Sequence, residues 1–362
     1  MHIIQIIPTY SGGGAEILAR ELHRGMLERD QESSIIFFCA NPRREKPGVR
    51  GEHFLGFQNP RSPGIALSLR RVIRRIITKQ QGPFVLHLHL TWGLFYGVVA
   101  SAGLDIPTIY TIHNTADRHQ KYAGAKLLFS TFFKRVDRLV AISESDSRNS
   151  FPTWLSIPSN KITVIPNGAR LFSDIKFEGA ATSSAKLVVV AVGSLIHRKG
   201  FDSLIEGIGT TTDIVESATI VGEGPDREAL EDQISRHSMK QVITLAGWQE
   251  NIAHFYARAN VAVISSRWEA FGLVAIEALS TGLPLVSAEV PGLKNVLSGC
   301  ESVFWYRSGS PTELAKALER VHDARRAGTD FSKSSKNFAA NFGMGAMVSK
   351  YAELYDRALV QN

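Results

Sequence analysis

The sequence predicts an α/β protein of two domains, each built on a parallel sheet that helices cover on both faces. Short apolar, β-branched segments alternate with helical segments through both halves of the chain. Residues 173–185, between the halves, are small and polar, which is typical of a linker. The 362 residues, 44% of them hydrophobic, are enough for two hydrophobic cores.

The expected strands are short apolar runs bounded by turn residues. They are residues 2–7, 34–39, 85–90, 108–112, 139–142 and 162–165 in the first half, and 186–192, 217–221, 242–246, 261–264 and 284–287 in the second. Strands that alternate with helices pair in parallel, so their carboxyl ends share one edge of each sheet. Ligands of open α/β sheets bind at this edge, and two such domains predict a central cleft between their edges.

The domain boundaries follow from this pattern. We expect an N-terminal domain of residues 1–172, the linker 173–185, a C-terminal domain of residues 186–345 and a last helical segment, 346–362. No apolar run reaches the ~18 residues of a membrane span, and the opening residues indicate a first strand, not a signal peptide. The two cysteines are far apart and fit no metal spacing, so the cytoplasm is the expected compartment.

The net charge of +7 is uneven. Residues 1–170 carry 22 Lys and Arg against 12 Asp and Glu, a net +10, and residues 171–362 carry 19 against 22, a net −3. The excess forms a first basic cluster of Arg70, Arg71, Arg74, Arg75 and Lys79, and a second of Lys121, Lys126, Lys134, Arg135 and Arg138. Both clusters alternate with apolar residues, which is typical of a helix on an anionic membrane, but also of a surface helix packed on a core. No nucleic-acid motif accompanies them, so we expect no nucleic-acid partner.

Residues 260–281 combine a strand, a short loop and a helix. The helix is expected over residues 271–281, so the unpaired N–H groups of Gly272, Leu273 and Val274 would lie beyond the carboxyl end of the strand, where they suit a phosphate. Glu269 precedes the helix and Glu277 follows roughly 7–8 Å along its axis. Such carboxylates would accept hydrogen bonds from the sugars of a nucleotide diphosphate sugar, although two solvated glutamates fit the spacing equally well.

Three further segments follow expected strands. The first strand leads into Gly12, Gly13, Gly14 and, two residues later, Glu16, a turn that allows close approach of a ligand. A dinucleotide-binding fingerprint is excluded, because the third glycine is missing and no carboxylate follows the second strand. The second segment, His113 and Asn114, follows the fourth expected strand. The third segment follows the first strand of the second half and contains Gly193 and the cations Arg198 and Lys199. The cations suit a pyrophosphate, but an exposed basic turn and a structural histidine are the simpler alternatives.

These segments together resemble the retaining glycosyltransferases of family 4, which have the GT-B fold of two Rossmann-like domains. Residues 269–277 match the E-x7-E motif, and residues 13–16 match the G-G-A-E loop. Residues 193–200 resemble the G-R-L…K-G segment, with Ser194 in place of its arginine. Weaker matches are the G-x-G-P turn at 222–225, the segment 246–248 and the P-N-G turn at 166–168. The resemblance covers about residues 2–360, with each motif in the family's order.

The resemblance implies an enzyme that moves a sugar from a nucleotide diphosphate sugar to a hydroxyl acceptor. It implies that residues 1–172 bind the acceptor, that residues 186–345 bind the nucleotide sugar, and that the helix of residues 346–362 crosses back to the N-terminal domain. It implies catalytic roles for His113, Glu269, Arg198 and Lys199. Donor binding is expected at Gly13, Gly14, Gly193, Arg198, Lys199, Gly222, Trp248, Phe271, Gly272, Leu273, Val274 and Glu277, and acceptor binding at Gly12, Glu16 and Asn114. No Asp-x-Asp occurs, so neither a metal nor a cofactor is expected.

The identity of the substrates is less determined. We expect a UDP-sugar, with GDP-mannose second, and a lipid-diphosphate-linked glycan acceptor in the synthesis of a cell-surface polysaccharide such as O-antigen, capsule or exopolysaccharide. A soluble sugar acceptor, a GT-B fold UDP-N-acetylglucosamine 2-epimerase and a non-catalytic nucleotide-sugar sensor are the alternatives. Peripheral contact with the inner face of the cytoplasmic membrane would occur through the two basic clusters.

Overall fold

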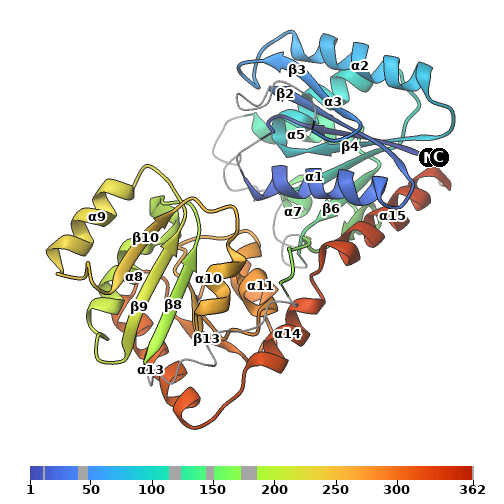
Figure 1. Ribbon diagram of the computed structural model, residues 1–362. Helices are drawn as coiled ribbons and strands as arrows, with labels where there is room; N and C mark the ends of the chain where they lie inside the picture. Colours follow the sequence, from blue (N-terminus) through green and yellow to red (C-terminus); the bar gives the residue numbers. More distant parts are fainter. Residues whose placement is uncertain (11–12, 40–47, 114–123, 144–150, 173–185, 361–362) are drawn as a thin grey trace. The chain divides into compact units, whose positions relative to one another are not determined.

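The computed structural model describes residues 1–10, 13–39, 48–113, 124–143, 151–172 and 186–360. These residues belong to two compact units (Figure 1). Unit 1 combines Met1–Gly168 with Met344–Asn362, and unit 2 is Ala169–Gly343. The expected linker, 173–185, lies outside the described residues.

Unit 1 contains a seven-stranded parallel sheet in the order β3-β2-β1-β4-β5-β6-β7. The strands are β1 His2–Ile7, β2 Glu32–Cys39, β3 Glu52–Phe57, β4 Phe84–His89, β5 Thr108–Ile112, β6 Arg138–Ala141 and β7 Ile162–Val164. The helices are α1 Gly14–Leu27, α2 Ile65–Lys79, α3 Leu90–Ser101, α5 Ala125–Phe133, α7 Phe151–Leu155 and α15 Met344–Val360, with a 3₁₀ turn at Ser159–Lys161. The order reverses beside β1, which is the arrangement of a doubly wound sheet.

The two faces of the unit 1 sheet are covered by different helices. Figure 1 shows α1 and α15 on one face and α2 and α3 on the other. The α2–α3 face is almost entirely apolar, with Ile4, Ile6 and Leu88 buried against Leu69 and Ile73. The opposite face carries a smaller apolar cluster around α1 together with buried polar side chains. Because burial of apolar area drives folding, the first face supplies most of the unit's hydrophobic core.

Unit 2 contains a six-stranded parallel sheet in the order β10-β9-β8-β11-β12-β13. The strands are β8 Leu187–Val192, β9 Val215–Val221, β10 Ile243–Gly247, β11 Val261–Ile264, β12 Leu285–Ala288 and β13 Val303–Tyr306. The helices are α8 Phe201–Gly209, α9 Arg227–Arg236, α10 Ala253–Arg258, α11 Leu273–Ser280, α12 Pro291–Val296, α13 Pro311–Arg326 and α14 Ser332–Ala340, with a 3₁₀ turn, η2, at His197–Lys199. The central strands β8 and β11 are nearly continuous apolar runs, as expected for strands buried on both faces.

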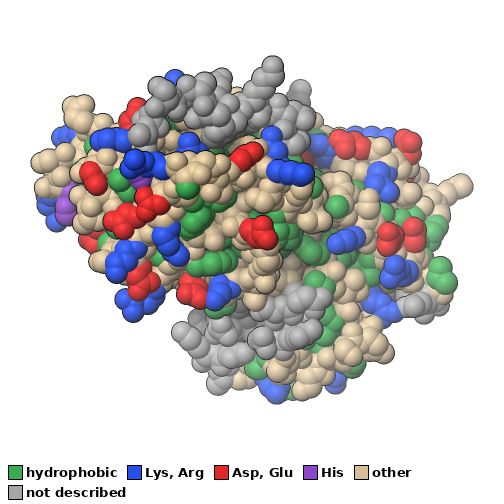
Figure 2. Space-filling model, turned by 90° about the horizontal axis from the view of Figure 1, so that it is seen from below, with side chains coloured by type: hydrophobic (Ala, Val, Ile, Leu, Met, Phe, Trp, Pro, Cys, Tyr) green, Lys and Arg blue, Asp and Glu red, His purple; other side chains and the backbone are tan. Residues whose placement is uncertain are grey.

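The prediction of two α/β domains with parallel sheets is confirmed. Two strands that the apolar pattern did not indicate, β3 and β13, are edge strands. On the face of the molecule in Figure 2, Lys and Arg side chains lie among Asp and Glu side chains instead of forming one continuous basic field. Within the described ranges, no helix is both long and apolar enough to cross a membrane.

Candidate functional site

The carboxyl edge of the unit 2 sheet gathers most of the expected donor-binding residues. Strand β11 ends at Ile264, a loop carries Glu269, and α11 begins at Leu273 after Gly272. Gly272 has a φ of 80°, and a Cβ there would lie 2.4 Å from the Leu293 side chain, so only glycine fits this turn. In the described part of the chain, the N–H groups of Leu273 and Val274 donate to no acceptor. They are therefore free to bind an anion, as the sequence predicts.

Two predicted site residues from distant parts of the sequence meet at this edge. Lys199 Nζ lies 2.5 Å from Glu269 Oε1, and the side chains are only 14% and 10% exposed. The hydroxyl of Ser266 donates a second hydrogen bond, of 2.8 Å, to the same carboxylate oxygen. A mostly buried ion pair of this kind is costly to break on one side only, because the remaining charge is left without a partner.

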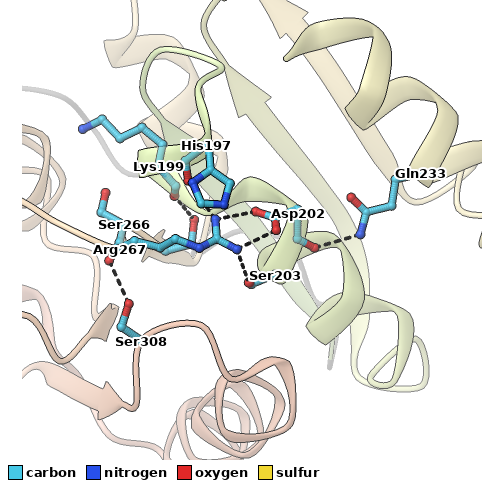
Figure 3. Close-up of polar contacts among 9 residues, drawn as sticks. His197, Lys199, Asp202, Ser203, Gln233, Ser266, Arg267 and Ser308 are labelled. Atoms are coloured by element: carbon cyan, nitrogen blue, oxygen red, sulfur yellow. Dashed lines mark hydrogen bonds and ion pairs between the residues drawn. The ribbon is translucent and has the colours of Figure 1, made fainter.

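Arg267 holds the Glu269 loop against the η2 turn that carries Lys199 (Figure 3). Its guanidinium donates 2.7 and 2.6 Å hydrogen bonds to the two carboxylate oxygens of Asp202 and a third, of 2.7 Å, to the His197 carbonyl. The pair with Arg267 holds the pKa of Asp202 below its usual range, although burial acts in the opposite direction. The backbone adds a hydrogen bond of 2.8 Å from the Arg267 N–H to the Arg198 carbonyl. Arg267 therefore fixes the relative position of Lys199 and Glu269.

The turns after β8, β9 and β10 pack closely beside this pair. A Cβ on Gly222 would lie 1.9 Å from the Gly193 carbonyl oxygen, and the Gly222 N–H donates a 2.8 Å hydrogen bond to the Gly247 carbonyl. The stem of Lys199 lies across Gly193. Close backbone packing thus accounts for Gly222 in the G-x-G-P turn, whether or not this glycine contacts a ligand. Trp248, which follows Gly247, is 69% exposed.

Glu277 lies on α11 and has an unusual environment. Burial raises the pKa of its carboxyl to about 7, and the nearby positive charge of Arg170 limits this rise. Tyr256 is fully buried beside α11, and its hydroxyl donates a 3.4 Å hydrogen bond to the Val274 carbonyl. A half-buried carboxylate with so high a pKa is typical of functional sites, where a bound ligand can donate hydrogen bonds to it.

Two other donor-site residues lie differently from what the motifs suggest. The guanidinium of Arg198 is exposed and lies 5.2 Å from the ring centroid of Trp268, so it does not join the Lys199–Glu269 pair. The ring of Phe271 is buried and packs edge-on against Phe342, with centroids 5.9 Å apart. Phe271 therefore anchors the loop before α11, and only its backbone is placed to reach a ligand.

In unit 1, the G-G-A-E loop forms the start of α1. The Glu16 carboxylate accepts hydrogen bonds from the Thr9 hydroxyl, at 2.8 Å, and from the Gly13 N–H, at 3.1 Å. This is the reciprocal bond of a capping box, so Glu16 stabilises the first turn, in which Gly14 is the first helical residue. Gly12 and Asn114, which we expect at the acceptor site, lie outside the described residues.

His113 follows β5 and contacts a second histidine that the sequence analysis did not single out. His113 Nε2 lies 3.1 Å from Nδ1 of His89, which is fully buried at the end of β4. Burial lowers the pKa of His113 to about 4, so its imidazole is neutral at pH 7. The alternation of His87 and His89 with apolar residues in β4 was a usable signal, because it places both imidazoles on one face of the sheet.

Sequence reasoning also missed Ser266, Arg267, Arg170 and Tyr256. Arg267 could have been found, since it lies two residues before Glu269, but the others are recognisable only from their contacts. In the described part of the chain, no three His, Cys, Asp or Glu side chains are grouped to hold a metal ion.

Solved structures similar to this chain show which fold it has. Sucrose-phosphate synthase from Thermosynechococcus elongatus superposes with a TM-score of 0.82 at 18% identity, covering 100% of both chains. Anabaena HepE in complex with UDP-glucose superposes with a TM-score of 0.80 at 18% identity, covering 99% of this chain and 100% of HepE. At such identities the likeness concerns the fold alone, which is the GT-B fold of glycosyltransferases.

Family models match both halves of the sequence. Glycosyltransferase Family 4 matches residues 12–171, and Glycosyl transferases group 1 matches residues 173–338. The chain belongs to the glycosyltransferases of this GT4, GT-B type.

Two curated relatives of this chain are bacterial glycosyltransferases. The lipopolysaccharide core biosynthesis glycosyltransferase LpsD of Rhizobium meliloti (strain 1021) is 27% identical over 181 residues, which are 50% of this chain and 52% of LpsD. The chain thus spans about half the length of that relative. The UDP-Gal:alpha-D-GlcNAc-diphosphoundecaprenol alpha-1,3-galactosyltransferase of Escherichia coli is 26% identical over 302 residues, 77% of this chain and 76% of that enzyme.

Proposed function

We propose that this protein is a retaining glycosyltransferase that moves a sugar from a UDP-sugar to a hydroxyl of a lipid-diphosphate-linked glycan during cell-surface polysaccharide synthesis. The observation that carries the proposal is the contact between Lys199 and Glu269 at the sheet edge where α11 begins. A cation, a carboxylate and free backbone N–H groups lie together there, as a nucleotide diphosphate sugar requires. Unit 2 would bind the donor, and unit 1 the acceptor.

In the proposed reaction, the bond between C1 of the sugar and the terminal diphosphate oxygen breaks while the acceptor oxygen bonds to C1 on the same face. The acceptor proton passes to the departing phosphate oxygen. Lys199, Arg198 and the N–H groups of Leu273 and Val274 would stabilise the negative charge on the departing diphosphate. Stabilisation of developing charge is usually the largest contribution to catalysis, and one such donor is worth roughly 3–4 kcal/mol. Glu269 would hold sugar hydroxyls, His113 would orient the sugar ring, and Glu277 would hold ribose hydroxyls.

The donor and the acceptor are proposed from two sources. The Escherichia coli relative is named for UDP-Gal and a diphosphoundecaprenol-linked acceptor, and the solved structure of HepE contains UDP-glucose. Exposed Trp248 at the end of β10 is suitably placed to contact a base. Neither these names nor Trp248 distinguishes glucose, galactose and their N-acetyl forms as the donor sugar.

Membrane contact is a separate proposal, which rests on α2 and α5. Arg71, Arg74, Arg75 and Lys79 are exposed on α2, whereas Arg70 donates hydrogen bonds to the carbonyls at the end of α3 and so serves the fold. On α5, Leu127 and Leu128 are 74% and 48% exposed beside exposed Lys126. Exposed leucines next to cations suit the headgroup region of an anionic bilayer. We therefore propose a cytoplasmic protein that binds the inner membrane face; Lys121 lies outside the described residues.

The first test is a thermal-shift screen of UDP, GDP, ADP and their sugar conjugates in the presence of EDTA. A ligand that binds only the native state raises stability by RT ln(1 + [L]/Kd), so we expect a rise with UDP and UDP-sugars without added metal. A rise with GDP-mannose instead would move the donor to guanosine. The absence of any rise would refute the donor site and favour a GT-B protein without catalytic function.

The second test follows the anomeric configuration by NMR. The donor is incubated with a lipid-diphosphate-linked sugar or a soluble sugar acceptor, and a retained α configuration in the product is expected with the lipid-linked acceptor. An inverted product would refute the same-face mechanism. Release of an epimerised sugar nucleotide without any acceptor would identify the protein as an epimerase.

A further inference from the structure

A row of polar side chains crosses the centre of the unit 1 sheet. It lies on the face that α1 and α15 cover, and Figure 1 shows where these two helices lie. Gln5 of β1 is the register partner of His87 of β4, and His89 is the partner of Thr111 of β5. Register partners in a parallel sheet share a face, as do residues two apart in a strand, so His113 continues the row beyond β5. The first four of these side chains are fully buried, and each therefore requires hydrogen-bond partners.

The Gln5 amide is oriented by the backbone of α1. One end of the amide lies 3.2 Å from the Ala19 carbonyl oxygen and the other end 3.2 Å from the His23 N–H. A carbonyl only accepts and an N–H only donates, so the amide nitrogen faces Ala19 and the amide oxygen faces His23. The second hydrogen of the same nitrogen then points to Nε2 of His89, at 3.1 Å. Gln5 is thus a donor to His89.

This direction determines which nitrogens of the two histidines carry protons. His89 Nε2 accepts from Gln5, so the proton of neutral His89 is on Nδ1, which lies 3.1 Å from His113 Nε2. His113 Nε2 is then the acceptor, and the proton of neutral His113 is on Nδ1. We propose that Gln5 and His89 are positioning residues that fix His113 in this tautomer, so that it presents an Nδ1–H donor to an oxygen of the substrate.

The charge state of the row supports a single tautomer. Burial holds the pKa of His89 well below its usual range, and the neighbouring imidazoles of His87 and His113 act in the same direction. The pKa of His113 is about 4. At neutral pH both rings therefore carry one proton each, and the hydrogen bonds decide where it lies.

His87 belongs to a separate branch of the row. Its Nδ1 lies 2.6 Å from the Tyr355 hydroxyl and its Nε2 2.8 Å from the Thr111 hydroxyl, whose oxygen also lies 2.9 Å from the Tyr351 hydroxyl. His87 touches His89 only through its ring, with centroids 4.0 Å apart. These contacts attach α15 to the sheet and transmit no proton to His113. Nδ1 of His113 makes no hydrogen bond within the described residues.

The inference on substrate contact rests on the proposed glycosyltransferase function, whereas the tautomer itself does not. Long-range ¹H–¹⁵N correlation spectra of the histidine-labelled protein report which ring nitrogen carries the proton, and the His113→Gln spectrum assigns the signals. We expect His113 protonated on Nδ1 in the free protein. A proton on Nε2 would overturn the proposal.

Two variants of His89, which are isosteric with each other, separate positioning from packing. In His89→Asn the amide N–H replaces Nδ1–H, so His113 keeps its proton on Nδ1 and turnover changes only a few-fold. In His89→Asp the ionised carboxylate can only accept, so Nε2 of His113 becomes protonated. We expect kcat to fall roughly 10–100-fold, the size of effect known for the outer-shell partners of metal-bound histidines. The control is His2→Gln, which should change neither the His113 tautomer nor kcat. His2 is buried in the same sheet but outside the row, and its Nε2 lies 2.9 Å from the Ser34 hydroxyl.

The outcomes are distinguishable. An unchanged His113 tautomer in folded His89→Asp would overturn the role of His89. If the Nδ1 signal of wild-type His113 appears as expected but does not shift with any sugar nucleotide, the assigned tautomer stands and the proposed function fails at this residue. If it shifts, and the shift is lost in His89→Asp but kept in His89→Asn, both proposals are supported.

Discussion

Substitution of Glu277 by glutamine should raise stability and weaken nucleotide binding together. Burial raises the pKa of this carboxyl from 4.5 to about 7, so the folded protein disfavours its ionised form. At pH values between these two, the folded protein binds a proton that the unfolded chain has released, and stability therefore falls as the pH rises. Above about pH 7, Glu277 is ionised in the folded protein too, and the free energy of unfolding is lowered by the full cost of burying this charge.

The pKa values give the magnitude. A change from 4.5 to about 7 corresponds to about 3 kcal/mol. We expect on the order of 2 kcal/mol, because solvent still reaches the half-buried side chain. The glutamine variant cannot ionise, so its stability relative to wild type should increase by this amount between about pH 5 and about pH 8. Its UDP affinity should fall, because a hydrogen bond to a charged group contributes roughly 1.5–3 kcal/mol, or about 10- to 100-fold.

Urea unfolding, followed by circular dichroism at about pH 5 and about pH 8, measures the stability difference. Calorimetric titration with UDP measures the change in affinity. Glu319→Gln, which removes an exposed carboxylate from α13 of the same unit, is the control and should change neither quantity. A stability difference that is equal at both pH values would refute the raised pKa. An unchanged affinity for UDP, with a loss confined to the sugar part of UDP-sugars, would refute the ribose assignment.

Three other changes test the remaining assignments. Lys199→Ala should abolish transfer without unfolding the protein, whereas Lys316→Ala on exposed α13 should not; near-normal turnover in the first variant would contradict the diphosphate assignment. Glu269→Gln should bind UDP a few-fold more tightly, because Lys199 loses its carboxylate partner, but transfer sugar at least ~100-fold more slowly; weaker UDP binding would be inconsistent with this competition. Reversal of the exposed arginine charges on α2 should reduce sedimentation with anionic liposomes but spare donor hydrolysis. The same charge change on α13 is the control and should not reduce this sedimentation.

Most of the strands that the sequence predicts are central strands buried on both faces, and the edge strands β7 and β10 are predicted as well. Residues 2–7, 108–112 and 261–264 are almost wholly apolar, and the structure has strands at these positions. β3 and β13 escape the pattern for local reasons. β3 begins with the polar residues Glu52 and His53, which interrupt an apolar run, and β13 is only four residues long.

The candidate site could be proposed from the sequence as a set of positions but not as a set of contacts. Spacing indicates Glu269 and Lys199 separately, yet they are 70 residues apart, and only the pairing of β8 with β11 brings their loops together. The same holds for Gln5 and His89, which are 84 residues apart. Both residues lie inside strands, and the apolar pattern that identifies a strand does not indicate whether a single polar residue in it has a function.

The ion pair has a further consequence for donor binding. Ser194 replaces the arginine of the family's G-R-L segment, and Arg267 already binds both oxygens of Asp202. Before a donor arrives, the charge of Lys199 is balanced by Glu269. In the proposed reaction, a diphosphate would therefore compete with Glu269 for Lys199, and sugar hydroxyls that replace Lys199 at Glu269 would compensate for the broken pair. A complete sugar nucleotide would make both exchanges, whereas the free nucleotide would make only the first. Under this proposal the pair favours the intact donor over the nucleotide product, which would help release of the product after transfer.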